Sequence, residues 1–174
     1  MADDYQRVAR TNNPYASDLS PADPLQSLED TSRRIETLVR GWSREEFERS
    51  YGPGKWSARQ LLIHLVHAET IFSERIRFAL ADPAYVVVPF DQDVWMKVEG
   101  SVVDAHAALQ AYLALRRMNL QLFRALTPEQ RARAFTHPER GTINVEWVIV
   151  AMAGHDRHHL PQFEAIAQRQ AAGV

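Results

Sequence analysis

Hydrophobic side chains recur every three or four residues in four long stretches of this chain, which is the spacing of amphipathic helices. The first stretch opens with Asp23 before a proline. The second opens at Ser57, whose capping box is completed by a glutamine three residues later. Two further capping boxes, at 43–46 and 127–130, predict short extra helices between the long ones. The pattern predicts four long helices, over about 24–40, 58–82, 102–125 and 145–166.

The segments before and between these helices lack such periodicity. Residues 1–22 are polar and interrupted by proline, so we expect an irregular N-terminal arm. Residues 84–100 fit no helical template, and a loop of this length in a small domain is often a functional lid. Residues 136–142 are interpreted as a loop leading into the last helix. The expected fold is all-α: an antiparallel four-helix bundle over 23–170, with short extra helices and a long loop between its second and third helices.

The composition suits one domain of this kind. With 174 residues, of which 45% are hydrophobic, the chain can bury a core without covalent cross-links. The absence of cysteine excludes disulfides, thiolate metal sites, iron–sulfur clusters and a cysteine nucleophile. The formal net charge of −2, with acidic and basic residues well mixed, gives no electrostatic footprint for nucleic acid. Neither a signal sequence nor a membrane-length apolar run is visible, so we expect a cytoplasmic protein that binds neither nucleic acid nor membrane.

Three of the seven histidines lie within five consecutive positions, and their spacing suggests a metal site. His155 and His159 are four residues apart, so on a helix they point the same way and can share one ion. On a helical wheel His159 falls roughly 40° and His155 roughly 80° from the centre of the apolar face. His64 falls about 90° from the centre of the apolar face of the second helix. These three side chains flank the predicted bundle interior and are the candidate metal ligands.

The other four histidines are expected to lie away from the bundle interior. The wheel turns His67 and His158 outward, about 150° and 140° from their apolar faces. His106 and His137 have no patterned partner and are expected at the surface. For the candidate ligands themselves, the plainer alternative is a hydrogen-bonded histidine at the edge of an apolar face.

One alternative motif overlaps the candidate ligands. His155-Asp156 with His159 is a variant of the zinc-protease pattern His-Glu-x-x-His, with Asp in place of Glu. Asp is one methylene shorter than Glu, and Asp156 falls on the apolar stripe of its helix. A buried structural hydrogen bond is therefore the favoured interpretation of Asp156.

Other polar residues are weaker candidates for a functional role. Asp91, Asp93 and Trp95 in the long loop could overhang a metal and contact substrate. The simpler interpretation is that the aspartates cap turns and the tryptophan packs. Glu69 and Arg75 are expected to form salt bridges rather than to take part in catalysis.

Two runs of this sequence resemble the DinB/YfiT-like superfamily. The first is GKWSARQLLIHL at 54–65, and the second is HPERGT at 137–142 followed by AGHDRHHLPQ at 153–162. The similarity extends in order, with plausible gaps, over residues 25–168.

This resemblance implies a four-helix bundle that binds a divalent metal through three histidines. One lies on the helix after Lys-Trp-Ser and two lie on the last helix, which by position are His64, His155 and His159. Members of the superfamily include bacillithiol S-transferases and mycothiol-dependent isomerases, and many others are named only as metal-dependent hydrolases. Members are commonly homodimers, so the resemblance also implies a homodimer here.

Three imidazole ligands leave coordination positions open, which is typical of a catalytic metal. Zinc or nickel is the expected ion, with iron and manganese left open. We expect an enzyme acting on a small-molecule substrate, either a hydrolase that activates water or an S-transferase. Because the chain lacks cysteine, any thiolate must come from a low-molecular-weight thiol cosubstrate. No catalytic residue is identified beyond the ligands, and the alternative is a non-catalytic metal-binding or stress-induced protein.

Overall fold

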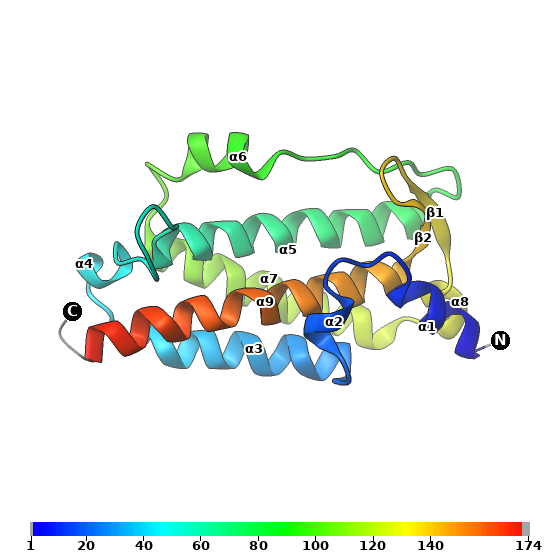
Figure 1. Cartoon of the computed structure of the whole chain (residues 1–174). Helices are drawn as coiled ribbons and strands as arrows, with labels where there is room; N and C mark the ends of the chain where they lie inside the picture. The colour runs from blue at the N-terminus through cyan, green and yellow to red at the C-terminus, as the bar shows by residue number, and fades with distance from the viewer. Residues whose placement is uncertain (1, 172–174) are drawn as a thin grey trace.

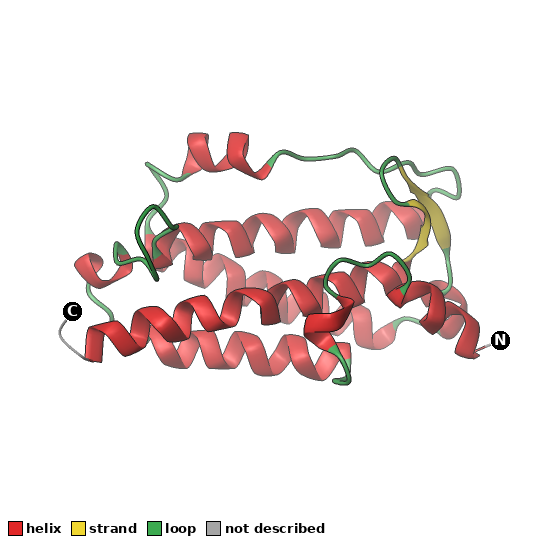
Figure 2. Ribbon diagram, viewed as in Figure 1, coloured by secondary structure: helices red, strands yellow, loops and turns green. Residues whose placement is uncertain are grey.

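A computed structural model describes residues 2–171 of the 174-residue chain, and four long helices lie side by side along its length (Figure 1). Helices dominate the described residues, as the colouring by secondary structure shows (Figure 2). No helix within this range combines the length and the apolar content needed to cross a membrane. The predicted four-helix bundle is confirmed, and its members are α3 (Pro24–Val39), α5 (Ala58–Ala81), α7 (Ala105–Ala125) and α9 (Val145–Ala171).

Capping side chains set the starts of most of these helices. Asp23 accepts a hydrogen bond from the backbone N–H of Gln26, and Ser57 forms the predicted capping box with Gln60. α7 begins later than expected because Asp104, rather than an earlier residue, accepts from the first free backbone N–H groups. The two short helices predicted from capping boxes are also confirmed, as α4 (Arg44–Phe47) and α8 (Pro128–Arg131).

The four long helices differ in direction, so that some neighbours run parallel and others antiparallel. The connection from α5 to α7 returns along the length of α5, so α5 and α7 run in the same direction (Figure 1). Arg59, near the start of α5, donates to the carbonyl groups of Gly100 (2.5 Å) and Val103 (3.3 Å), just before α7 begins. α9 packs against α3 and α5, and α7 packs against the same two helices. The bundle is antiparallel across α5–α9 and α3–α7 but parallel within α3–α9 and α5–α7, because the long connection carries the chain back to the start of α5. The predicted antiparallel arrangement therefore holds for only two of these four pairs.

A polar layer divides the bundle core into two apolar clusters. One cluster surrounds the first half of α9 and includes Ile76 and Phe123, and the other surrounds its second half and includes Ile35 and Phe163. Between the clusters all four long helices bury polar side chains, which are Thr31, Ser32, His64, Glu69, Arg116, Asn119, His155, Asp156 and His159.

A further helix lies inside the segment that the sequence predicts as a long loop. α6 (Gln92–Glu99) occupies its second half, and Asp91 caps this helix by accepting from the backbone N–H groups of Asp93 and Val94. Only Met96 of its eight residues is buried. An apolar pattern this short gives no helical periodicity to recognise, so the loop prediction is wrong over α6.

A small hairpin replaces the loop predicted at 136–142. It consists of the antiparallel strands β1 (Ala134–His137) and β2 (Gly141–Asn144). Phe135 and Ile143 pair across the hairpin and are both buried, which is what anchors it to the bundle. Strands of four residues are too short to show the alternation from which strands are predicted.

The prediction of an irregular arm over 1–22 is wrong for much of that range. α1 (Ala2–Arg10) and α2 (Ala16–Leu19) are helical, and both pack along α9. Residue 1 lies outside the described residues. Helices this short form in water only when packing supports them, so the polar sequence of the arm did not reveal them.

The turn between α1 and α2 is held closely against α9. Asn13 donates to the carbonyl of Trp147 (3.0 Å), and the indole N–H of Trp147 donates to the carbonyl of Thr11 (3.0 Å). Farther along α9, a Cβ atom at Gly154 would overlap the backbone carbonyl of Tyr15. The absence of a side chain at Gly154 therefore lets the N-terminal segment reach the bundle.

Substitution of Gly154 by alanine should lower the stability of the protein. The added methyl group would push against the Tyr15 carbonyl, at a cost of about 1–3 kcal/mol. At an unobstructed helical position the same change stabilises by roughly 0.5–1 kcal/mol, because glycine is a poor helix former. The midpoint of urea unfolding shows whether the substitution destabilises or stabilises the protein. A higher midpoint for Gly154→Ala would show that the N-terminal segment does not lie against this turn of α9.

Candidate metal centre

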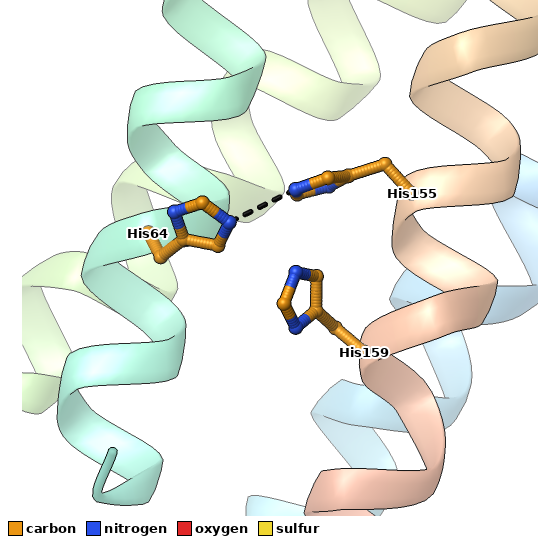
Figure 3. A group of neighbouring side chains, drawn as sticks. All are labelled: His64, His155 and His159. Atoms are coloured by element: carbon orange, nitrogen blue, oxygen red, sulfur yellow. Dashed lines mark hydrogen bonds between the residues drawn. The ribbon is translucent and has the colours of Figure 1, made fainter. Parts of the chain in front are cut away.

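Three histidine rings meet between α5 and α9, with their nitrogen atoms facing a common space (Figure 3). His64 extends from α5, while His155 and His159 extend from successive turns of α9. Their available ligand atoms lie within 4.8 Å of one another, and the Nε2 atoms of His64 and His155 are 2.9 Å apart. The structure thus brings together the three residues that the sequence selects.

The cluster fits a divalent metal ion in both donor type and spacing. Two imidazole nitrogens that share one zinc ion at about 2.0–2.1 Å lie roughly 3–3.5 Å apart. The 2.9 Å between His64 and His155 is close to that separation. The donor set of three nitrogens suits zinc, nickel and related transition metals. Since His64, His155 and His159 are 3%, 4% and 9% exposed, solvent contributes little to satisfying these nitrogens.

Burial keeps two of these imidazoles neutral. Desolvation, with added repulsion from His155 and His159, lowers the pKa of His64 from 6.5 to about 2. Desolvation and then His155 lower the pKa of His159 from 6.5 to about 4. Both rings are uncharged at neutral pH, and the neutral ring is the form that binds a metal.

A glutamine one turn away orients His159. The Nδ1 atom of His159 lies 3.0 Å from Oε1 of Gln162, and because an amide oxygen only accepts, this Nδ1 carries the proton. The lone pair of His159 is thereby left on Nε2, the atom that faces the cluster. The Nδ1 atoms of His64 and His155 are buried and have no hydrogen-bond partner among the described residues.

Aromatic rings enclose the cluster. Trp56 lies beside His64, with ring centroids 4.9 Å apart, and Tyr15 meets His155 edge-on at 5.1 Å. Phe72 approaches His155 from α5 at 5.9 Å. None of these three aromatic residues is predicted from the sequence to belong to the site. Trp56 does stand in the run that resembles the superfamily, whereas Tyr15 reaches His155 only because the N-terminal segment folds onto α9.

A buried charge network adjoins the histidines. The guanidinium of Arg116 donates to Oε1 of Glu69 (2.5 Å), Oδ2 of Asp156 (2.7 Å) and the carbonyl of Leu28 (2.7 Å). Tyr112 donates its hydroxyl to the same Oδ2 of Asp156 (2.8 Å). The buried hydrogen bond predicted for Asp156 is confirmed, as is the salt bridge predicted for Glu69. Because Asp156 is committed to this network, it is not free to act as the general base of a protease-type motif.

The pKa values of the two carboxyl groups in this network shift in opposite directions. Burial raises the pKa of the Glu69 carboxyl, although the Arg116 guanidinium opposes this effect. For Asp156 burial acts in the same direction, but Arg116 and the hydrogen bonds to the carboxylate outweigh it and lower the pKa to about 2. Oδ1 of Asp156 lies 3.9 Å from Nδ1 of His155, which is too far for a hydrogen bond. Asp156 therefore places a negative charge next to a candidate ligand without binding it.

The prediction that His67 faces outward is wrong. The residue is buried, its Nε2 lies 3.0 Å from a carboxylate oxygen of Glu99, and its ring meets Trp95 edge-on at 5.1 Å. α6 packs over this side of α5, so a position that lies far from the apolar face of α5 is nevertheless covered. His67 is absent from the group whose ligand atoms converge.

The other histidines follow the predictions in part. His158 and His106 are exposed, as expected. His137 is buried, contrary to the prediction, because it ends β1 and its Nδ1 accepts the backbone N–H of Glu139 (3.2 Å). The hairpin that contains His137 gives no signal in the helical patterns that predict exposure.

Of the remaining candidate residues, two have structural roles and one lacks its predicted salt bridge within the described range. Asp91 caps α6, and Trp95 packs against His67 and Phe90. Both observations agree with the simpler interpretation of these residues. The salt bridge predicted for Arg75 is not among the ion pairs of the described residues, and its buried Nε has no hydrogen-bond partner there.

The lowered pKa values predict that the metal-free protein loses stability in mild acid. In the unfolded chain histidine takes up a proton near pH 6.5. In the folded protein His159 does so only near pH 4 and His64 near pH 2. Acid therefore favours the unfolded chain below pH 6.5, by about 1–2 kcal/mol per histidine between pH 7 and pH 5.

Urea unfolding of chelator-treated protein across this pH range measures the effect. A variant with His64→Gln and His159→Gln should lose less stability over the same range, because its glutamines do not titrate. An equal loss in the variant and the wild type would assign the pH dependence to other groups.

Comparison with known proteins agrees with the four-helix bundle. A protein of Oceanobacillus iheyensis named "putative metal-dependent hydrolase" is 27% identical over 146 residues, which cover 84% of this chain and 85% of that protein. A Bacillus mycoides protein with the same description is 22% identical over 145 residues, covering 83% and 84%. Among solved structures, YfiT from Bacillus subtilis, described as "a probable metal-dependent hydrolase with an unusual four-helix bundle topology", shares the fold. Its TM-score is 0.76 at 23% identity, with 85% of this chain and 86% of that chain covered. Residues 27–163, most of the sequence, match the DinB superfamily, and the chain belongs to that superfamily.

Proposed function

We propose that this chain is a metal-dependent hydrolase of small molecules in which His64, His155 and His159 hold one divalent ion. One observation carries the proposal: buried imidazoles from two helices present their ligand atoms within 4.8 Å of one another. The descriptions of the curated relatives support it. Zinc or nickel is the proposed ion, because both accept an all-imidazole site.

The ligand set suits activation of a nucleophile. A divalent ion with open coordination positions lowers the pKa of a bound water or thiol and polarises a carbonyl group. The residues of the chain supply neutral nitrogen donors, keep solvent away from them, and hold His159 in one orientation through Gln162. None of the three candidate ligands is a carboxylate. The ligands therefore do not neutralise the positive charge of the ion, which would act on the bound nucleophile in full.

The same site could activate a thiol instead of water. The chain has no cysteine, so the thiolate would come from a low-molecular-weight thiol cosubstrate, and the reaction would be an S-transfer. Water is placed first because the relatives are described as hydrolases.

A non-catalytic role in metal binding or stress response is the second candidate. The depth of the site favours it, since His64 and His155 are only 3% and 4% exposed. A closed site of this kind could hold an ion without turnover. Activity measurements separate the two candidates.

We expect the purified protein to carry about one divalent ion per chain. His155→Ala and His159→Ala should each lose it, because two imidazoles hold an ion much less tightly than three. Elemental analysis of each purified variant gives the metal content directly.

Two neighbouring histidines provide matched controls. His158→Ala should keep the ion because His158 is exposed, and His67→Ala should keep it because His67 pairs with Glu99. If His67→Ala empties the site while His155→Ala does not, the ligand assignment is wrong.

We also expect hydrolysis that depends on the histidine cluster. A panel of small esters and amides, together with thiol-reactive electrophiles, should be tested with and without added low-molecular-weight thiols. The active combination should lose about 100-fold or more in rate in His159→Ala, because the ion that stabilises the developing charge is gone. Dependence on thiol would assign S-transfer. Metal-loaded protein without activity on any member of the panel would favour the non-catalytic role.

A further inference from the structure

A pocket of about 280 Å³ adjoins the histidine cluster, between α5, α9 and three connecting segments. Tyr15 and Phe72 line it, and the rings of both lie close to His155, at 5.1 and 5.9 Å. Phe90 and Trp147 add two more aromatic surfaces. A ligand held in this pocket would thus lie next to a proposed metal ligand.

Arg75 brings a buried and poorly satisfied charge to this pocket. It is 8% exposed, and its Nε has no hydrogen-bond partner among the described residues. The guanidinium lies 5.8 Å from the centre of the Phe72 ring, a contact that does not replace hydrogen bonds. Arg116, also buried, has two carboxylates and a carbonyl as acceptors. Among the described residues Arg75 has no comparable set of acceptors, and leaving its buried Nε without one is costly to the fold.

The other polar groups at the pocket leave positive charge in excess. Arg140 adds a second guanidinium, and Glu139 is the only carboxylate among the described lining residues. His137 accepts at Nδ1 from the backbone of Glu139, so its proton is on Nε2 and it is a further donor. Burial lowers the pKa of Arg75, and the nearby carboxylates of Glu74 and Glu139, which oppose this effect, form no hydrogen bond with its Nε.

We propose that this pocket binds the oxyanion of an aromatic small molecule, a carboxylate or a phosphate, with Arg75 as its anchor. A guanidinium pairs with two oxygens of such a group through charge-assisted hydrogen bonds. The aromatic residues of the pocket pack against the ring of the ligand. The far end of the ligand then reaches Tyr15 and Phe72, beside His155. Aromatic oxyanions are accordingly the substrate class of the enzyme, a conclusion that rests on the function proposed above.

Titration of the chelator-treated protein tests the pocket without any metal. The probes are phenylacetate, phenyl phosphate and the neutral 2-phenylethanol. The readout is the NMR signal of the Trp147 indole N–H, assigned with Trp147→Phe. At least one anion should bind about 10-fold or more tightly than 2-phenylethanol, since only the anions gain charge-assisted hydrogen bonds. The anion that binds identifies carboxylate or phosphate as the preferred group. Equal binding of all three probes, or none, overturns the proposal.

Replacement of the anchor should remove the preference for anions. Arg75→Met should weaken binding of the preferred anion by about 10-fold or more and leave 2-phenylethanol unchanged. Arg117→Met removes the same charge from an exposed position of α7 and should change neither. If Arg75→Met binds the anion as tightly as the wild type, Arg75 is not the anchor.

Stability measurements separate a binding role from a structural one. Arg75→Met should unfold at the same urea concentration as the wild type or a higher one, because it removes a buried charge that lacks acceptors. Arg116→Met should unfold at a lower concentration, because it leaves Glu69 and Asp156 unpaired. If Arg75→Met is destabilised as strongly as Arg116→Met, or fails to fold, Arg75 is structural and the proposal is wrong.

Failure of this inference is distinguishable from failure of the metal site. His155→Ala should lose the metal and keep anion binding, whereas Arg75→Met should lose anion binding and keep the metal. Intact metal binding without anion binding in the wild type overturns only the pocket assignment. Anion binding by a wild-type protein that takes up no divalent metal overturns only the metal site.

Discussion

The guanidinium of Arg116 is the group on which the histidine cluster depends. From α7 it contacts Glu69 on α5, Asp156 on α9 and the carbonyl of Leu28 on α3, so it joins all four long helices at one level. Removing one partner of such a buried pair costs about 3–5 kcal/mol, which opposes any sliding of one helix along another. Asp156 directly follows His155, so the same contacts fix the turn of α9 that carries a candidate ligand.

Two different effects set the charge states of the polar groups in this layer. Pairing keeps Asp156 ionised, with a pKa of about 2, while desolvation keeps His64 neutral, with a pKa of about 2 as well. The apolar clusters on either side exclude the water that would otherwise weaken both effects. An apolar layer would serve stability at least as well. The polar groups are therefore best explained by the need for neutral nitrogen donors at fixed positions.

The sequence predicts the parts of this structure that have long periodic patterns. The four helices, and the convergence of His155 with His159, follow from spacings of three and four residues. The patterns do not predict burial of His67, because the helix that covers it has a single buried residue, Met96. Nor do they show that Arg75 has no salt bridge among the described residues, or that Glu69 pairs with an arginine 47 residues away, because only the folded chain defines such contacts. The patterns do not predict the pocket either, since three separate connections enclose it.

Anomalous diffraction from crystals of the zinc-loaded protein tests the central claim most directly. The account predicts one strong peak at the zinc edge in each chain, bonded to Nε2 of His159 and to nitrogens of His64 and His155. It also predicts that the Arg116 network keeps its present contacts in that crystal. No peak among these rings, or a peak bonded instead to His67 and Glu99, would contradict the account.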